Sequence, residues 1–288
     1  MRRFLSGHVN YSRRLREIFV TQPRWNIHQF VIHRAYAWPL TMLIRYLRLL
    51  HAFGRAFWIL WIKFPRMPRE KKLQAIQAWS QETLKILGIE VIHESVMAQI
   101  EQSASPLMLV ANHVSWVDVL IIQSIQPSIF VAKAEVKRWP IVGNIATGCG
   151  VVFVDRGSPS SARRMVDEVS SALHHGYCVA GFPEGTSSEG NSVSLFHANL
   201  FEAAINHHIQ VQPLAIRYTD PRTGALCLKA AFIGDIGFVQ SLHQVITSQG
   251  IQVKVHAGDM LSPQGHSRRT LAHLSHRSVS SQLELLNA

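Results

Sequence analysis

Charged side chains are scarce in this sequence. Asp, Glu, Lys and Arg together make up 16% of its 288 residues, where about 25% is ordinary for a globular domain. Hydrophobic residues make up 47%, which is too many for a disordered chain. The mean hydropathy of +0.09 is nevertheless well below that of a polytopic membrane protein. This balance is typical of a globular protein that rests on a membrane.

Several signatures of common enzyme classes are absent. The sequence contains no Gly-x-x-x-x-Gly-Lys-Ser/Thr phosphate-binding loop, no complete dinucleotide-binding glycine pattern and no Gly-x-Ser-x-Gly nucleophile elbow. The three cysteines, Cys149, Cys178 and Cys227, are widely spaced and odd in number, which argues against a disulfide framework and favours buried thiols in a reducing compartment. The histidine pairs at 174–175 and 207–208 cannot both face one metal from a helix. We therefore expect no metal site.

Positive charge is concentrated at the N-terminus. Residues 1–72 hold fifteen Lys and Arg against two acids, a net charge of +13, whereas the other 216 residues hold fourteen basic and sixteen acidic side chains, a net charge of −2. A basic segment attracts an anionic polymer or an anionic bilayer. A nucleic-acid binder would need this charge on its folded domain, so no nucleic-acid partner is expected. The basic start, 1–4, precedes no apolar run, and no cleaved secretory signal is predicted.

Residues 39–64 form an apolar and aromatic stretch that three arginines interrupt. It contains no uncharged run of about 18 residues, which argues against a simple transmembrane helix. At about 100° per residue its basic side chains share one stripe of a helix, and Pro39 suits the first helical position. We predict a helix lying in the membrane interface. Packing on the protein's own core, a tilted spanning helix and nucleic-acid binding are the alternatives. The basic stripe comprises Arg45, Arg48, Arg55 and Lys63.

The rest of the chain alternates between helical and strand patterns. Residues 70–87 predict a helix that ends at Gly88, and 159–175 predict another that ends at Gly176. This alternation predicts an α/β fold with a mostly parallel sheet, in which 73–288 form one domain after a membrane-associating segment, 1–72. The predicted strands are the short apolar runs 89–92, 107–111, 129–132, 151–154, 177–182, 211–218 and 251–255.

The segment Asn-His-Val-Ser-Trp-Val-Asp, residues 112–118, carries the first chemical signal. His113 and Asp118 are five residues apart, about 140° around a regular helix, so they would not meet on one. They can meet if His113 lies on a strand-to-helix turn and Asp118 in the first helical turn. A carboxylate on one ring nitrogen would orient the imidazole and leave the other as a general base. A helix-capping turn with an incidental His and Asp is the alternative.

Three further groups of polar residues follow predicted strands, where open α/β sheets bind ligands. Lys133 follows one strand and could supply positive charge or be an ordinary solvated lysine. Arg156, after Asp155, could hold an anion bidentately or form a surface ion pair. The turn Phe-Pro-Glu-Gly-Thr-Ser-Ser, 182–188, offers a carboxylate, amides and hydroxyls, or is an ordinary turn.

Taken together, these segments resemble the four-block pattern of the glycerolipid acyltransferase family. The blocks read NHVSWVD, VAKAE followed by WPIVG, GVVFVDR and FPEGTSS, and the resemblance covers roughly residues 85–260. It implies an α/β acyltransferase domain with an N-terminal helical element embedded in one leaflet. It also implies that His113 and Asp118 are a catalytic dyad in which the histidine deprotonates an acceptor hydroxyl, which attacks an acyl thioester on CoA or acyl carrier protein.

The resemblance further implies which residues bind the acceptor head group. These are Arg156 and the segment Glu184, Gly185 and Thr186, and Ser115, Lys133 and Ser187 complete the predicted substrate-binding set. No cofactor is expected besides the acyl donor.

The pattern departs from the phosphate-binding members at two places. Those members have an arginine where this chain has Ser187, and many carry a Lys-Lys-Gly run where it has Phe-His-Ala-Asn, 196–199. The cations expected at these two places are missing, and in this respect the chain resembles the subgroup that includes lyso-ornithine-lipid acyltransferases. We therefore predict a monotopic O-acyltransferase for lyso-ornithine lipid or a similar lysolipid at the cytoplasmic face of an anionic bacterial inner membrane. The alternatives are a 1-acyl-sn-glycerol-3-phosphate acyltransferase that makes phosphatidic acid and a non-catalytic lipid-binding protein.

Overall fold

The computed structural model describes residues 27–101, 106–155 and 159–288 of the chain. Its internal contacts divide the chain into two compact units, Met1–Leu43 and Ile44–Ala288. The second unit contains the sheet and the residues of the candidate site that are described below. Residues 44–72 are thus grouped with the α/β domain by their contacts, and a separate membrane role for 1–72 stays a prediction.

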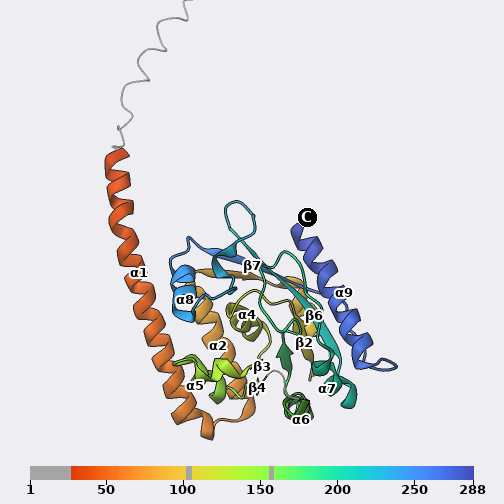
Figure 1. Ribbon diagram of the computed structural model, residues 1–288. Helices are drawn as coiled ribbons and strands as arrows, with labels where there is room; N and C mark the ends of the chain where they lie inside the picture. The colour runs from red at the N-terminus through yellow and green to blue at the C-terminus, as the bar shows by residue number, and fades with distance from the viewer. Residues whose placement is uncertain (1–26, 102–105, 156–158) are drawn as a thin grey trace, which may run out of the picture. The chain divides into compact units, whose positions relative to one another are not determined.

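A seven-stranded sheet forms the centre of the described part of the second unit (Figure 1). Its strand order is β1-β7-β6-β2-β5-β3-β4. All neighbouring pairs are parallel except β6 and β7, which are antiparallel. The predicted α/β class with a mostly parallel sheet is confirmed, and each predicted strand is present. The strands are β1 (Ile89–Ile92), β2 (Met108–Ala111), β3 (Ile129–Lys133), β4 (Val152–Val154), β5 (Val179–Gly181), β6 (Val211–Thr219) and β7 (Ile251–Ala257).

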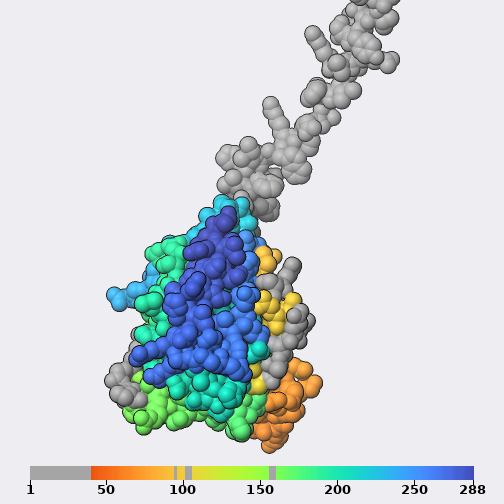
Figure 2. Space-filling view, turned by 90° about the vertical axis from the view of Figure 1, so that its right-hand side faces the viewer, coloured from red at the N-terminus to blue at the C-terminus, as the bar shows by residue number. Residues whose placement is uncertain are grey.

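Helices cover both faces of the sheet. Helix α2 packs on α4 on one side, while α6, α7 and α9 contact one another and the strands on the other (Figure 1). Figure 2 shows the second side, where the dark-blue side chains of α9 cover the middle of the surface. The α-helices are α1 (Ile27–Trp58), α2 (Arg69–Leu87), α3 (Glu94–Glu101), α4 (Val117–Ile125), α5 (Val142–Gly148), α6 (Pro159–His174), α7 (Phe201–Asn206), α8 (Phe238–Ile246) and α9 (Arg268–Asn287). Shorter turns are η1 (Ile59–Lys63), η2 (Phe64–Arg66), η3 (Ala134–Arg138), η4 (Ala198–Leu200) and η5 (Leu228–Ala230).

Two glycines end helices where the sequence predicts. Gly88 follows α2 in the left-handed conformation, with φ of 74°, and its amide donates to the carbonyls of Leu84 and Lys85. Gly176 follows α6 with φ of 79°. A residue without Cβ adopts this conformation at little cost, which is why glycine ends helices so often.

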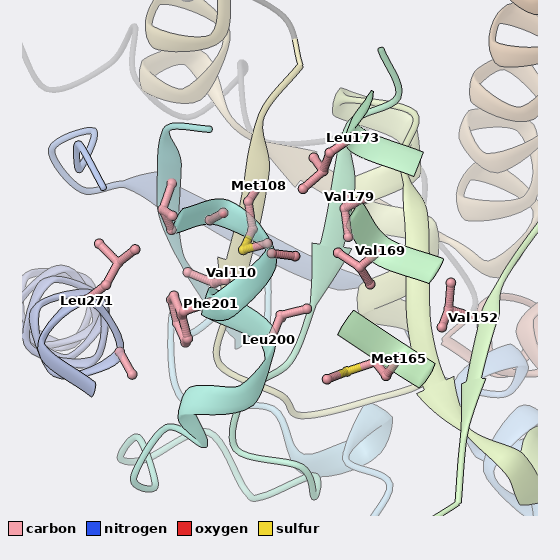
Figure 3. Close-up of a cluster of buried hydrophobic side chains, with 14 residues drawn as sticks. Met108, Val110, Val152, Met165, Val169, Leu173, Val179, Leu200, Phe201 and Leu271 are labelled. Carbon is pink, nitrogen blue, oxygen red and sulfur yellow. The ribbon is translucent and has the colours of Figure 1, made fainter. Parts of the chain in front are cut away.

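The core is built from apolar side chains of the central strands and of the helices that cover them. Met108 and Val110 on β2 meet Val169 on α6 and Phe201 on α7 (Figure 3). All four are completely buried. Strands β2, β5 and β6 are buried along almost their whole length, which is typical of strands that are covered on both faces.

The order of the strands brings the sequence motifs together. Strands β2, β5, β3 and β4 are consecutive in the sheet and parallel. The carboxyl ends of parallel strands lie at one edge, so the loops after these four strands are neighbours. The loops after β2, β5 and β4 begin at Asn112, Phe182 and Asp155, and Lys133 is the last residue of β3. Segments up to about 70 residues apart in the chain therefore share one edge.

The helix predicted to begin at Pro39 begins instead at Ile27 and includes Pro39 in its interior. Pro39 therefore does not mark the start of the helix. The helix continues through it although a proline inside a helix removes one backbone hydrogen bond. From Ile44 onward the helix packs on the domain through Leu49, Ala52 and Ala56, which are buried. Among the described residues, no helix is long and apolar enough to cross a membrane.

The predicted basic stripe is divided between two environments. Arg45 donates to the carbonyls of Ile246, the last residue of α8, and of Ser248, at 2.8 and 3.3 Å. Arg55 pairs with Glu82 of α2. Arg48 is exposed. Arg45 and Arg55 therefore have partners within the domain, and a role of the basic stripe at an anionic membrane stays a prediction.

Candidate active site

His113 and Asp118 form a hydrogen-bonded pair at the carboxyl end of β2. His113 lies in the turn after the strand, and Asp118 is in the first turn of α4. The ring Nδ1 donates to Asp118 Oδ2 at 2.9 Å. The contact that the spacing predicts is present because a turn, rather than a continuous helix, separates the two residues.

The Asp118 carboxylate is completely buried and accepts several hydrogen bonds. The backbone amides of Val114 and Ser115 donate to Oδ2, each at 2.8 Å. The phenol of Tyr218 on β6 donates to Oδ1 at 2.6 Å. Burial raises the pKa of Tyr218 well above its ordinary value, and the charge of Asp118 raises it further. The phenol therefore keeps its proton and remains a donor.

The backbone of His113 is held by a second buried carboxylate. The amide of His113 donates to Glu184 Oε1 and the amide of Ser194 donates to Oε2, both at 2.7 Å. Burial raises the pKa of Glu184, and the hydrogen bonds from these amides oppose the rise. The imidazole ring stacks on Phe182, with centroids 4.1 Å apart and planes 9° apart. The ring is thus fixed through its backbone, one face and Nδ1.

A cavity of about 1100 Å³ opens beside the histidine. Its wall includes His113 and the turn formed by Gly185, Thr186 and Ser187. The rest of the wall is mostly apolar and comes from α1, η1, α2, α4, α5 and α6. Its apolar side chains include Phe53, Leu60, Leu87, Leu120, Ile145 and Met165. One imidazole in the wall of a mostly apolar cavity is suited to chemistry on a substrate with a hydrocarbon chain.

The comparisons with known proteins agree with this geometry. A family model described as acyltransferase matches residues 87–217. The lyso-ornithine lipid O-acyltransferase of Pseudomonas aeruginosa is 35% identical over 179 residues, which cover 62% of this chain and 68% of that protein. The chain belongs to the acyltransferase family. A further relative is the 1-acyl-sn-glycerol-3-phosphate acyltransferase of Neisseria gonorrhoeae, which is 33% identical over 149 residues, covering 52% of this chain and 58% of that protein.

A solved structure shares the fold of this acyltransferase. The crystal structure of the 1-acyl-sn-glycerophosphate acyltransferase from Thermotoga maritima superimposes with a TM-score of 0.61 at 21% identity. The match covers 88% of this chain and 98% of that one.

The residues predicted to bind substrate in this acyltransferase divide into three groups. Lys133, Gly185, Thr186 and Ser187 line the cavity, and Ser187 donates to the carbonyl of Phe232. The two residues Ser115 and Glu184 do not contribute to the cavity wall. Arg156 lies outside the described residues.

Ser115 and Glu184 are buried outside the cavity wall, and their predicted contacts with substrate stay untested. Ser115 is completely buried and its Oγ accepts from the amide of Val117, so it caps the start of α4. Glu184 is 4% exposed, and both of its oxygens accept from backbone amides. Both side chains accept hydrogen bonds from backbone amides, and in this way they stabilise the turns that form the site.

Sequence reasoning missed three contributors to the acyltransferase site. Tyr218 comes from β6, 100 residues beyond Asp118, and a fully buried strand offers no alternation that would mark it. The sequence places Phe182 only at the start of a turn, although its ring stacks on the imidazole. His197 also lines the cavity, and its departure from the phosphate-binding pattern was the signal that could have identified it. Within the described residues, no group of three His, Cys, Asp or Glu side chains could hold a metal ion.

Proposed function

We propose that this acyltransferase moves a fatty acyl group from a thioester of CoA or acyl carrier protein to the hydroxyl of a lysolipid, with His113 as general base. The observation that carries the proposal is the buried Asp118 on one nitrogen of an imidazole that lines an apolar cavity. The named relatives act as lysolipid acyltransferases. A soluble thioester and a membrane lipid would both need access to this imidazole.

The proposed reaction uses the two nitrogens of His113 differently. Nδ1 keeps its proton and donates it in a hydrogen bond to Asp118. Nε2 is therefore free to take the proton of the lysolipid hydroxyl. The acceptor oxygen then bonds to the acyl carbon, the carbon–sulfur bond breaks, and the proton passes from the imidazolium to the departing thiolate. Asp118 stabilises the imidazolium throughout, and Glu184 and Phe182 hold the ring in place for both proton transfers.

The cavity is proposed to hold hydrocarbon. Its wall includes His113 together with apolar side chains of α1 and α2, so a chain attached to the reacting carbon or to the acceptor would leave water as it enters. Burial of apolar surface stabilises such a complex by about 25 cal/mol per Å².

Lyso-ornithine lipid, or a similar lysolipid with a weakly charged head group, is the proposed acceptor. A phosphomonoester carries nearly two negative charges at neutral pH and is commonly held by an arginine fork. Among the described residues of the cavity wall, the turn after β5 contributes the hydroxyls of Thr186 and Ser187, and β3 contributes the basic side chain of Lys133. Lysophosphatidic acid is the second candidate, because a relative is named for that activity and because Arg156 belongs to the motif.

The protein is proposed to lie on the cytoplasmic face of an anionic bacterial inner membrane. Leu47, Leu50, Trp58, Trp61 and Ile62 are each more than half exposed. These five side chains are called the apolar face below. Exposed aliphatic and aromatic side chains next to an exposed cation such as Arg48 are suited to a membrane interface.

The deciding experiment compares the two acceptors with one acyl donor. We expect kcat/KM to be higher for lyso-ornithine lipid than for lysophosphatidic acid, and Ser187→Arg to shift the ratio toward the phosphate acceptor. His113→Ala should lose roughly 10²–10⁴-fold in turnover with either acceptor, while a change at the exposed His175 should leave turnover unchanged. Normal turnover in purified His113→Ala protein would overturn the mechanism, and a clear preference for lysophosphatidic acid would overturn the acceptor.

A further inference from the structure

The Asp118 carboxylate is enclosed on two sides by donors from different parts of the fold. Oδ2 faces His113 Nδ1 and two amides of the turn after β2, at 2.8–2.9 Å. Oδ1 points toward β6 and accepts the hydroxyl of Tyr218 at 2.6 Å. The turn therefore fixes one oxygen, and a separate strand fixes the other.

Tyr218 is placed to act on the carboxylate permanently. It is 1% exposed and lies on a strand whose backbone is paired with both β2 and β7, so it cannot move without the sheet. Burial raises the pKa of the phenol well above its ordinary value. A donor that stays protonated at every working pH contributes the same hydrogen bond throughout the reaction.

We propose that Tyr218 is a positioning residue for acyl transfer: its hydroxyl holds Oδ1 of Asp118 so that Oδ2 faces His113, and it shares the negative charge that stabilises the imidazolium. This inference rests on the proposed general-base role of His113. A hydrogen bond to a carboxylate draws charge from the oxygen that faces the histidine. Without that hydrogen bond, the carboxylate would stabilise the protonated imidazole more strongly.

The ionisable groups around this pair are few in the described residues. Glu184 faces His113 from the turn after β5 and interacts with it electrostatically. The thiol of Cys227 faces Tyr218, and it is buried and unpaired with another cysteine. The effect expected below is therefore assigned to the Tyr218 hydroxyl, with Glu184 and Cys227 left unchanged in every variant.

Tyr218→Phe removes the hydroxyl and keeps the ring. The pH profile of kcat/KM should keep its shape while its acidic limb moves upward by roughly half to one pH unit. At neutral pH, kcat should fall roughly 10-fold with little change in KM, because the substrate contacts are untouched. A tyrosine that only fills space would lower the unfolding midpoint without moving the acidic limb.

A second variant keeps the test decisive if Tyr218→Phe folds poorly. Site-specific replacement of Tyr218 by 3-fluorotyrosine retains the hydroxyl and makes it a stronger donor, so the acidic limb should move in the opposite direction. Tyr177→Phe is the matched control, because Tyr177 contacts Arg69 on the surface, and its profile should be that of the unmutated enzyme. Unchanged limbs in both Tyr218 variants, or shifts in one common direction, would overturn the proposal. If these limbs stay unchanged while His113→Ala is inactive, the positioning role fails and the proposed function stands.

Discussion

Two carboxylates in this site show how surroundings, rather than residue type, assign a role. Asp118 and Glu184 are both buried, yet Asp118 reaches the imidazole while Glu184 binds only the backbone that carries it. Both oxygens of Glu184 face amide donors, so the ionised carboxylate fits this position and a donor group does not. Both residues belong to the sequence motifs, and their hydrogen bonds distinguish the carboxylate that contacts the imidazole from the one that holds only backbone amides.

Glu184→Gln should therefore weaken both folding and turnover. The new amide nitrogen would face the amide of His113 or of Ser194, and one buried donor would lose its acceptor. We expect the free energy of unfolding to fall by about 1–3 kcal/mol and kcat to fall with it. Denaturant unfolding and steady-state kinetics check this, with Glu189→Gln as the control, since the side chain of Glu189 is exposed and should change stability by less than about 0.5 kcal/mol. Unchanged stability of Glu184→Gln would contradict the supporting role.

At the scale of elements, α1 from Ile44 onward presents two different sides to its surroundings. One side packs on the domain, with Trp79 of α2 donating to the carbonyl of Ala52 at 3.0 Å and its ring meeting Phe53 edge-on. The other side carries Leu47 and Leu50 of the apolar face. The predicted interface helix and its alternative, a helix packed on the protein's own core, thus describe two sides of one element, although attachment to a membrane stays a prediction.

Arg45 and Arg48 should differ in what they stabilise. The guanidinium of Arg45 hydrogen-bonds the carbonyls at the C-terminal end of α8 and lies close to Gly88, where a Cβ would be 2.9 Å from its Nη2. We expect Arg45→Gln to lower the free energy of unfolding by about 1–2 kcal/mol. Arg48→Gln should leave unfolding unchanged and weaken binding to anionic vesicles by about 1 kcal/mol. Equal effects of the two changes on unfolding would show that the contacts of Arg45 contribute nothing.

The apolar face should be the part of this element that enters a bilayer. Leu50→Glu combined with Trp61→Glu places charge at two side chains that are 68% and 67% exposed, so the fold should tolerate the change. Binding to phosphatidylglycerol-containing vesicles should fall at least 10-fold, because each buried side chain contributes about 1.5–3 kcal/mol. Leu285→Glu is the control, since Leu285 is 63% exposed on α9. Co-sedimentation of the double variant at the level of the unmutated protein would contradict the assignment.

For the whole molecule, the titration of Cys149 and Tyr218 predicts a loss of stability in alkali. Burial raises the pKa of the Cys149 thiol from 9.0 to about 12, and the pKa of Tyr218 is also raised. The unfolded chain releases these protons at lower pH than the folded one. The folded state therefore holds more protons between pH 9 and about 12, and the free energy of unfolding falls as the pH rises through that window. Cys149→Ala should flatten this fall when denaturant midpoints are measured at several pH values, and an equally steep fall in the variant would contradict the assignment.

The sequence by itself determined the strands of the sheet, the ends of two helices and the pair of residues at the centre of the candidate site. Short apolar runs bounded by turn residues marked each strand, and Gly88 and Gly176 marked the ends of two helices, because backbone conformation and apolar periodicity are local properties. The pairing of His113 with Asp118 was also predictable, since a five-residue separation across a turn leaves few arrangements.

Only the tertiary structure decided which groups face the cavity and which support it. Tyr218 reaches Asp118 because β6 lies beside β2, and no property of either segment alone specifies that neighbour. In the same way Glu184 meets the amide of His113 because β5 lies on the other side of β2, and Arg45 is held by the carbonyl at the C-terminal end of α8 because that helix packs within its reach. Buried polar groups must find partners wherever the fold places them, and those partners come from elements that are distant in the chain.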